Sequence, residues 1–269
     1  MNKTNKLPLF FHDKPFFALD IGHGSLKVMQ VRPTTEGMPR IIGYGTAFFD
    51  KSAIENGVVK DAKSIADATL ELFKHHLIGD ITSRRVAITI PSYRTFTRSL
   101  QVPRLKPKEL REAVELDAEQ YISMPLEQLY FDYEITSENK DTTELFTVAV
   151  PQEIVNSYLE LAQILGLEPI LIETTMSAAA RLFAQDNQSD MASVIIDFGS
   201  LSSDIGIFDK HLLVTGTVQG GGVVFTDAIR DKLGVSHTEA VIIKIKYGMG
   251  LSKKQKEITE ALEPTLQQI

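Results

Sequence analysis

Apolar residues recur along the chain with two periods, and each period predicts one kind of secondary structure. Short apolar or alternating runs that end at Gly or Pro predict strands, whereas apolar residues three and four positions apart predict amphipathic helices. The strand-like runs are Phe16–Arg32 and Ser193–Ile207 (each two strands around a turn), Ile41–Phe49, Arg85–Ile90, Phe96–Val102, Leu129–Ile135, Leu145–Val150, Glu168–Glu173 and Leu212–Val218. The helix-like runs are Asp61–His76, Lys106–Ile122, 151–165, Ser177–Phe183, Phe225–Leu233, Thr238–Tyr247 and Lys253–Ile269. This mixture predicts an α/β protein.

The composition narrows the class of function. The chain has 269 residues, of which 43% are hydrophobic and 23% charged, as in ordinary globular proteins. Its formal net charge of −7 argues against general binding to nucleic acid, which needs a basic face. There is no cysteine, so disulfides, thiolate metal sites and Cys nucleophiles are excluded. No apolar run reaches the roughly 18 residues of a membrane span, so we expect no direct membrane insertion.

One turn pattern occurs twice in the chain. The first copy is ALDIGHGSLK, from Ala18 to Lys27, and the second is IIDFGSLSSD, from Ile195 to Asp204. In both, an apolar strand runs into an Asp, glycines and hydroxyls follow, and a second apolar strand leaves. Each copy therefore predicts a β-hairpin whose turn carries a carboxylate.

These residue types suit the binding of a phosphate chain. Glycine lets backbone N–H groups approach phosphate oxygens closely, and Ser hydroxyls can donate to them. An Asp repels phosphate but can hold a divalent cation through water, and Lys27 adds a positive charge beside the first turn. Two such turns across a cleft would hold one nucleotide from both sides. The alternative for each copy is a tight hairpin with a solvent-exposed acid. Neither copy is a P-loop or a Rossmann turn.

Paired hairpins of this kind are the signature of the actin, sugar-kinase and Hsp70 superfamily. More narrowly, the chain resembles the PilM family, a relative of FtsA, from about Phe16 to Gly250. LDIGHGSLKVMQV resembles the family's first phosphate hairpin, AEQYISMPLEQLYFDY is the most family-specific stretch, and IIDFGSLSSDIGIF with GTVQGGGVVFTDAI resembles the second hairpin and the segment after it. The resemblance implies an actin-like (ribonuclease H-like), two-lobed ATPase fold with an inserted FtsA/PilM-type subdomain.

The resemblance also implies a domain organisation. It places an N-terminal tail at 1–15, a first lobe at 16–44 and 148–188, an inserted subdomain at 45–147, and a second lobe at 189–269. The polar segment Gln185–Asp190 would link the two halves. Family members continue for some tens of residues beyond position 269, with a Gly-Gly adenine-binding motif and a closing helix. The resemblance therefore implies a C-terminally truncated, incomplete second lobe.

ATP and Mg²⁺ are the cofactors that the resemblance implies. The residues carried over to nucleotide binding are Asp20, Gly22, His23, Gly24, Ser25 and Lys27 from the first hairpin, Asp197, Gly199, Ser200, Ser203 and Asp204 from the second, and Gly221, Gly222 and Lys244 beyond it. Asp20 and Asp197 would hold the metal through water. Thr175 stands where the family has an acid, which leaves Glu173 as the candidate for a catalytic base.

By this resemblance, the chain is a cytoplasmic ATP-binding scaffold of the type IV pilus inner-membrane assembly platform. It would dock the N-terminal cytoplasmic peptide of PilN and link it to the pilus motor ATPases, lying peripheral to the inner membrane through these partners. Self-association stays open, and hydrolysis is expected to be weak or absent. Two alternatives remain: an FtsA-like cell-division protein, and a small-molecule kinase of the same superfamily, which would need a carboxylate base. The cytoplasmic part of a type II secretion protein is a related possibility.

Overall fold

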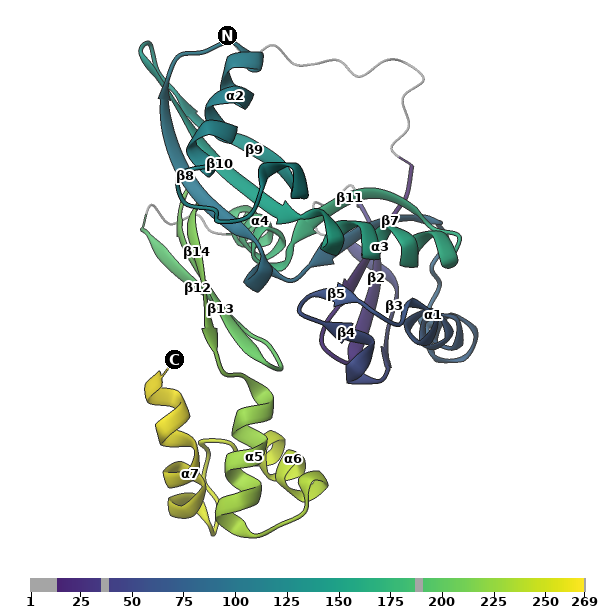
Figure 1. Ribbon diagram of the computed structural model, residues 1–269. Coiled ribbons are helices and arrows are strands. Elements are labelled where there is room, and N and C mark those ends of the chain that lie inside the picture. Colours follow the sequence, from purple (N-terminus) through teal and green to yellow (C-terminus); the bar gives the residue numbers. More distant parts are fainter. Residues whose placement is uncertain (1–13, 35–38, 187–190, 269) are drawn as a thin grey trace.

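The structure is a computed structural model that describes residues 14–34, 39–186 and 191–268 (Figure 1). Most of the expected tail, and residues 187–190 of the expected linker, lie outside the described residues. The strands are β1 (Phe17–Ile21), β2 (Ser25–Arg32), β3 (Arg40–Phe48), β4 (Ile54–Glu55), β5 (Val58–Val59), β6 (Ile78–Gly79), β7 (Arg85–Ile90), β8 (Phe96–Pro103), β9 (Leu129–Glu138), β10 (Thr142–Pro151), β11 (Glu168–Thr174), β12 (Ser193–Phe198), β13 (Ser202–Asp209) and β14 (His211–Gln219). The helices are α1 (Ala62–Glu71), α2 (Pro107–Ala118), α3 (Gln152–Ile164), α4 (Thr175–Asp186), α5 (Gly222–Leu233), α6 (His237–Lys246) and α7 (Gln255–Gln268).

The main sheet has the strand order β11-β7-β1-β2-β3-β6 within the described residues. β1 pairs antiparallel with β2 and parallel with β7, so Asp20 lies beside Lys27 on one side and Thr89 on the other. Helices α1 and α3 supply Ile65 and Tyr158 to the core under this sheet, where apolar side chains of β1, β2 and β7 are buried. The first hairpin thus stands on the most buried part of the molecule.

The main sheet and its core include residues beyond position 45, where the inserted subdomain was expected to begin. The strand β7 pairs with β1 in parallel, and Ile65 of α1 is fully buried in the same core as Leu19. Residues 45–95 therefore belong with the main sheet. The reason is topological, because a parallel neighbour for β1 needs a long crossover, and the chain makes that crossover through α1. The apolar pattern of residues 85–90 predicts a strand but carries no information about its partner.

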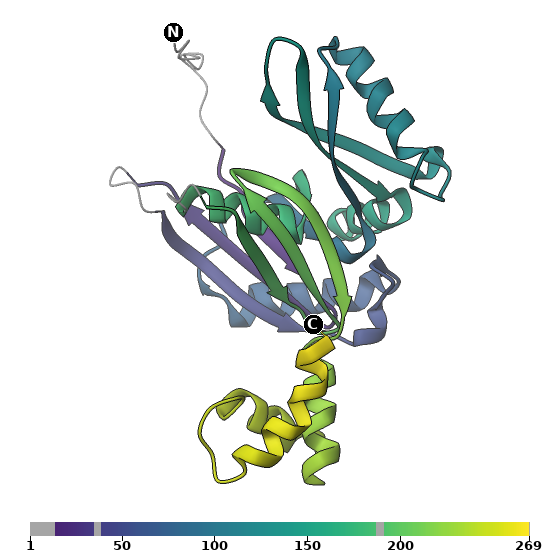
Figure 2. The same cartoon turned by 90° about the vertical axis from the view of Figure 1, so that its left-hand side faces the viewer.

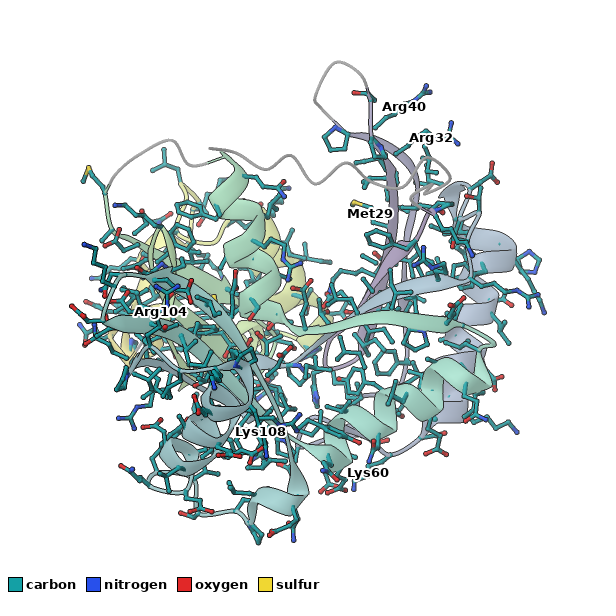
Figure 3. All side chains as sticks on the ribbon, turned by 90° about the horizontal axis from the view of Figure 1, so that it is seen from above. Met29, Arg32, Arg40, Lys60, Arg104 and Lys108 are labelled. Carbon is teal, nitrogen blue, oxygen red and sulfur yellow. The ribbon has the colours of Figure 1, made fainter. Side chains whose placement is uncertain are left out.

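The unit inserted between β7 and α3 is smaller than expected. Its antiparallel sheet has the order β8-β10-β9 within the described residues, and we call it the inserted sheet. Helix α2 packs on it through Leu110 and Val114, which contact Val102 and Leu145. Figure 3, viewed from above, shows Arg104 and Lys108 of this unit well apart from Arg32 and Arg40 at the far end of β2 and β3. The inserted sheet is therefore a separate body attached to one side of the main sheet.

The last third of the chain forms a second sheet and a helical cluster. The second sheet has the order β12-β13-β14, and α5, α6 and α7 pack together below it through Ile229, Ala240, Ile258 and Leu262. Figures 1 and 2 show this cluster projecting away from the three sheets. Within the helix-like run 253–269, Ile258 and Leu262 pack in this cluster, Leu266 is 40% exposed, and α7 continues through Pro264.

One small apolar cluster connects the inserted sheet and the second sheet to α4, the helix that follows β11 of the main sheet. It contains Phe146 from β10, Met176 and Ala180 from α4, Phe208 from β13 and Leu212 from β14, and we call it the hinge cluster. Beside it, β14 runs next to β8, where the hydroxyls of Thr97 and Thr215 are 2.6 Å apart. Ser99 Oγ also donates to the carbonyl of Leu213 at 2.5 Å. These contacts fix the second sheet against both other units.

The main core can be tested with two isoleucines in the same sheet. Ile88 on β7 is 1% exposed and Ile78 on β6 is 59% exposed. We expect Ile88→Ala to lower the free energy of unfolding by about 2–5 kcal/mol, because it leaves a cavity, and Ile78→Ala to change it by less than about 0.5 kcal/mol. Urea denaturation of both variants measures this. Equal losses would contradict the assignment of β7 to the core.

Candidate functional site

Both hairpins face one cleft of about 520 Å³. Its lining residues are Asp20, Ile21, Gly22, His23, Gly24, Ser25, Lys27, Phe48, Lys51, Ile54, Pro91, Tyr93, Tyr158, Thr175, Asp197, Phe198, Gly199, Ser200, Leu201, Ser202 and Asp204. The main sheet supplies one wall and the second sheet the other. Asp20 and Asp197 both line this cleft.

The first turn is tight and orients its carboxylate. The backbone N–H of Gly22 donates to the carbonyl of Ser25 at 2.8 Å, and Gly24 has a φ of +136°, which favours glycine. Lys27 Nζ donates to Asp20 Oδ2 at 2.9 Å, and Thr89 Oγ1 donates to Asp20 Oδ1 at 2.7 Å. The carboxylate of Asp20 is therefore held from both neighbouring strands, at the edge where β1 and β7 end.

The second turn is packed against the start of α5. Gly199 N–H donates to the Ser202 carbonyl at 3.0 Å, and Gly222 N–H donates to the Gly199 carbonyl at 3.0 Å. A Cβ atom on Gly221 would lie 2.5 Å from the Gly199 oxygen, so only glycine allows this approach. The turn and the helix start form a cradle of closely packed backbone, as phosphate sites require.

Two carboxylates stand opposite each other at this turn. Asp197 and Asp204 are paired across β12 and β13, and Thr217 Oγ1 donates to Asp204 Oδ1 at 2.5 Å. Burial raises the pKa of Asp204, and the negative charge of Asp197 raises it further, while the Thr217 hydrogen bond lowers it. Because two like charges are brought close here, a bound cation would relieve their repulsion.

Cationic groups gather around the same cleft. Lys51 lies in the 3-10 turn Lys51–Ala53, which is capped by the Asp50 side chain accepting the N–H of Ser52 at 2.8 Å. Burial lowers the pKa of both His23 and Lys244, and the charge of Lys51 lowers each further. Lys51 therefore acts electrostatically on groups from both sides of the cleft. An anion between them would offset this repulsion.

The structure divides the predicted nucleotide-binding residues into two sets. Those that line the cleft are Asp20, Gly22, His23, Gly24, Ser25, Lys27, Asp197, Gly199, Ser200 and Asp204. Those that lie behind its wall are Ser203, Gly221, Gly222 and Lys244: Ser203 Oγ donates to the Gly220 carbonyl at 2.8 Å, and Lys244 Nζ donates to the Gly222 carbonyl at 2.6 Å. These contacts support the turn from behind. Ser203 faces away from the cleft because it alternates with Asp204 along β13.

Glu173, the candidate for a catalytic base, is not among the residues that line the cleft. Glu173 lies on β11 in a different hollow, where Arg181 Nη2 is 2.6 Å from its Oε2. Burial raises the pKa of Glu173, and the charge of Arg181 lowers it. Thr175, two residues on, lines the cleft instead. Among the described residues, the carboxylates on the cleft wall are Asp20, Asp197 and Asp204, which the hairpins themselves supply.

Several residues of the site were not predicted from the hairpin motifs. They are Lys51, Thr89, Tyr93, Tyr158 and Thr217. The sequence could have predicted Thr89, because this residue stands near the carboxyl end of a strand before Pro91. Parallel strands bring those ends to one edge of a sheet. Lys51 and the two tyrosines lie far from either hairpin in the sequence, so no local pattern marks them.

The site fits a nucleotide polyphosphate with a divalent cation. The turns at Gly22, Gly24 and Gly199 bring backbone to the cleft wall without side chains, and Lys27 and Lys51 supply positive charge. The oriented carboxylate of Asp20 is the ligand type that Mg²⁺ prefers, directly or through water. These residues would bind and orient such a ligand.

A groove of about 400 Å³ lies between the inserted sheet and the main sheet. Both walls are edge strands: β9 pairs only with β10, and β11 only with β7, within the described residues. The floor is apolar, and its residues are Val148, Val150, Val155, Leu171 and Ile172. Tyr130, Glu134, Glu173 and Arg181 stand along it. We call this feature the edge groove.

A neighbouring hollow of about 420 Å³ shares Phe146 and Ser177 with the edge groove and continues along α4 to Leu212.

Comparisons with known proteins agree on the fold. A family model described as type IV pilus assembly protein PilM matches residues 18–269. A solved PilM–PilN type IV pilus biogenesis complex superposes with a TM-score of 0.76 at 23% identity, covering 93% of this chain and 72% of that one. The crystal structure of MreB 5 of Spiroplasma citri bound to AMPPNP gives a TM-score of 0.51 at 16% identity, covering 95% of this chain and 76% of that one. The predicted actin-like fold is confirmed.

One curated relative is a cell division protein FtsA of Enterococcus faecalis. It is 25% identical over 257 residues, and the match covers 87% of this chain and 58% of that protein. The chain thus spans little more than half the length of this relative. In the part of the chain that the structure describes, no helix is both long and apolar enough to cross a membrane.

The contact between the second turn and α5 can be tested at two glycines. A Cβ atom on Gly221 would overlap the Gly199 and Ser200 carbonyls, whereas on Gly216, in β14, it would meet nothing within 4 Å. We expect Gly221→Ala to destabilise the protein by about 1–3 kcal/mol through this overlap. Gly216→Ala should be neutral or slightly stabilising, because alanine has less backbone entropy to lose. Urea denaturation of both variants checks this, and an unaffected Gly221→Ala would contradict the close packing.

Proposed function

The chain belongs to the family of the type IV pilus assembly protein PilM, and from that premise we propose that it is an ATP-binding scaffold of the pilus assembly machinery. The observation that carries the proposal is the cleft in which two duplicated hairpins, from two different sheets, face each other. A ligand that contacts both hairpins favours the arrangement that brings them together. Nucleotide would therefore set the shape of the protein.

The residues of the cleft divide the work of holding Mg·ATP. The turn backbones at Gly22, Gly24 and Gly199 would approach the phosphates, and Lys27 and Lys51 would offset their charge. Asp20 and Asp197 would hold the water shell of the cation. When bound, the cation bridges and neutralises phosphate oxygens. The binding of AMPPNP by MreB 5 supports a nucleotide in a cleft of this fold.

We propose that the edge groove docks the N-terminal cytoplasmic peptide of PilN. An extended peptide suits two facing edge strands, because their free N–H and C=O groups can pair with its backbone. The apolar floor gives pockets for its side chains, and Glu134, Glu173 and Arg181 supply charged groups along the same groove. The solved PilM–PilN complex of this fold supports a partner of that kind.

A physical connection runs from the cleft to the edge groove. The second hairpin continues into β14, which contacts β8 through Thr97 and Thr215. The inserted sheet carries this contact across β10 to β9, the wall of the groove. Phe146 of β10 also belongs to the hinge cluster and lines the groove. Movement of the second sheet on nucleotide binding would thus change the groove that receives the peptide.

A metabolic kinase is less well supported. It needs a carboxylate base aimed at a substrate hydroxyl in the cleft, and Glu173 lies in the edge groove instead. We also propose that this scaffold lies in the cytoplasm and is peripheral to the inner membrane, where PilN would hold it. The link to the pilus motor ATPases and self-association remain predictions of the family resemblance.

Removing either hairpin carboxylate tests both parts of the proposal together. We expect Asp20→Ala and Asp197→Ala to weaken Mg·ATP binding about 10-fold or more, since each removes a group that would orient the cation's water shell. A synthetic PilN N-terminal peptide should bind the wild type more tightly with Mg·ATP than without, and both variants should lose this gain. Calorimetry with ATP and fluorescence anisotropy with the peptide measure the two effects.

Asp67→Ala is the control for these variants, because Asp67 is exposed on α1 and does not line the cleft. It should bind ATP and peptide as the wild type does. Unchanged ATP affinity in both hairpin variants would sink the proposal. Normal nucleotide binding without any effect on the peptide would sink the connection alone.

The edge groove can be tested with two tyrosines of similar exposure. Tyr130 on β9 is 45% exposed and lines the groove, whereas Tyr44 on β3 is 42% exposed and lies outside it. We expect Tyr130→Ala to weaken peptide binding about 10-fold or more, as tyrosines at interfaces often do, and Tyr44→Ala to leave it unchanged. Both variants should keep the wild-type ATP affinity. Equal peptide binding by both would place the docking site elsewhere.

A further inference from the structure

The hydroxyl of Tyr158 is a buried polar group without a hydrogen-bond partner among the described residues. Tyr158 lies on α3, is only 1% exposed, and packs in the main core with Ile154 and Leu161. A buried hydroxyl left unpaired costs about 1–3 kcal/mol, and most such groups in proteins are satisfied. Phenylalanine would fill the same space without that cost. The hydroxyl therefore calls for a reason beyond packing.

Tyr158 also lines the cleft between the hairpins. Burial raises its pKa, and Tyr93 and the Asp20 carboxylate raise it further, so the phenol stays neutral at physiological pH. Asp20 lines the same cleft as Tyr158. The two Asp20 oxygens already accept from Lys27 and Thr89. The hydroxyl thus borders the site of Asp20 without bonding to it.

A second tyrosine continues this arrangement across the cleft. Tyr93 also lines the cleft. Burial raises the pKa of Tyr93, the charge of Arg94 lowers it, and the charge of Asp204 raises it further. The two tyrosines therefore line the same cleft as Asp20 of the first hairpin and Asp204 of the second. Negative charge on both hairpins attracts a cation and disfavours phosphate oxygens. A neutral phenol can accept a hydrogen bond from water bound to such a cation.

We propose that the Tyr158 hydroxyl recognises a hydrated divalent cation at Asp20, by hydrogen bonding to a water of its shell. The inference rests on the proposed Mg·ATP site and adds a residue that no motif contains. It makes Tyr158 a specificity-determining residue for the cation, while the lysines and the turns act on the phosphates. The bound water would also satisfy the orphaned hydroxyl, so cation binding would remove an unfavourable feature of the empty protein.

The test is Tyr158→Phe, which removes one oxygen and leaves the packing. Urea denaturation of the protein without ligands should give the variant a stability equal to or higher than that of the wild type. Calorimetry should show ATP affinity that is about 10-fold lower than wild type with Mg²⁺ and equal to wild type in EDTA. Thermal denaturation with Mg²⁺ alone should show a smaller stabilisation of the variant than of the wild type.

Tyr121→Phe is the matched control, because Tyr121 is a half-buried tyrosine of the inserted unit outside the cleft. It should leave all these ligand measurements unchanged. A Tyr158→Phe variant that is less stable without ligand but binds Mg·ATP normally would overturn the inference and leave the proposed function intact. An equal loss of ATP affinity with and without Mg²⁺ would overturn it too, since the hydroxyl would then contact the nucleotide. A wild type that binds neither Mg²⁺ nor ATP would end both.

Discussion

The hinge cluster is the constraint on which the cleft depends. Two hairpins from different sheets can face each other only if the second sheet is held in place, and Phe146, Met176, Ala180, Phe208 and Leu212 provide that attachment. The packing is close, because a Cβ atom on Gly206 would lie 2.9 Å from the sulfur of Met176. Apolar contacts of this kind are non-directional and can be remade with small shifts, unlike a strand ladder. The attachment therefore rests on side-chain packing rather than on strand pairing.

The repeated turn could be found in the sequence because it is local. An Asp between an apolar strand and glycines identifies a hairpin and its chemistry within ten residues, and both hairpins form as expected. The pairing of β7 with β1 could not be found in that way, since an apolar run such as Arg85–Ile90 fits any buried strand. The position of Glu173 depends on which side of β11 it faces, and the positions of Lys51 and Tyr158 depend on tertiary packing. Periodicity predicts the element, whereas its neighbours follow from the assembled fold.

The net charge of the whole chain does not describe the charges around the cleft. A formal net charge of −7 argues against polyanions as general partners, yet Lys27 and Lys51 line one cleft beside three carboxylates. Lys27 pairs with Asp20, whereas Lys51 repels His23 and Lys244, and the carboxylates repel within the second hairpin. A ligand with both signs, an anion carrying its own cation, complements both sets. Average composition hides such a site, since a few residues decide it.

The helical cluster of α5, α6 and α7 is attached to the second turn through the start of α5. Its first helix is bonded to that turn through the N–H groups of Gly222 and Val223, while the cluster projects away from the three sheets. Helix α5 has 12 residues, which corresponds to a length of about 18 Å. At its other end, Ile229 of α5 packs with Ile258 and Leu262 of α7, so the three helices form one body joined to the turn. A rotation of the turn would therefore displace the far end of this cluster more than the turn itself.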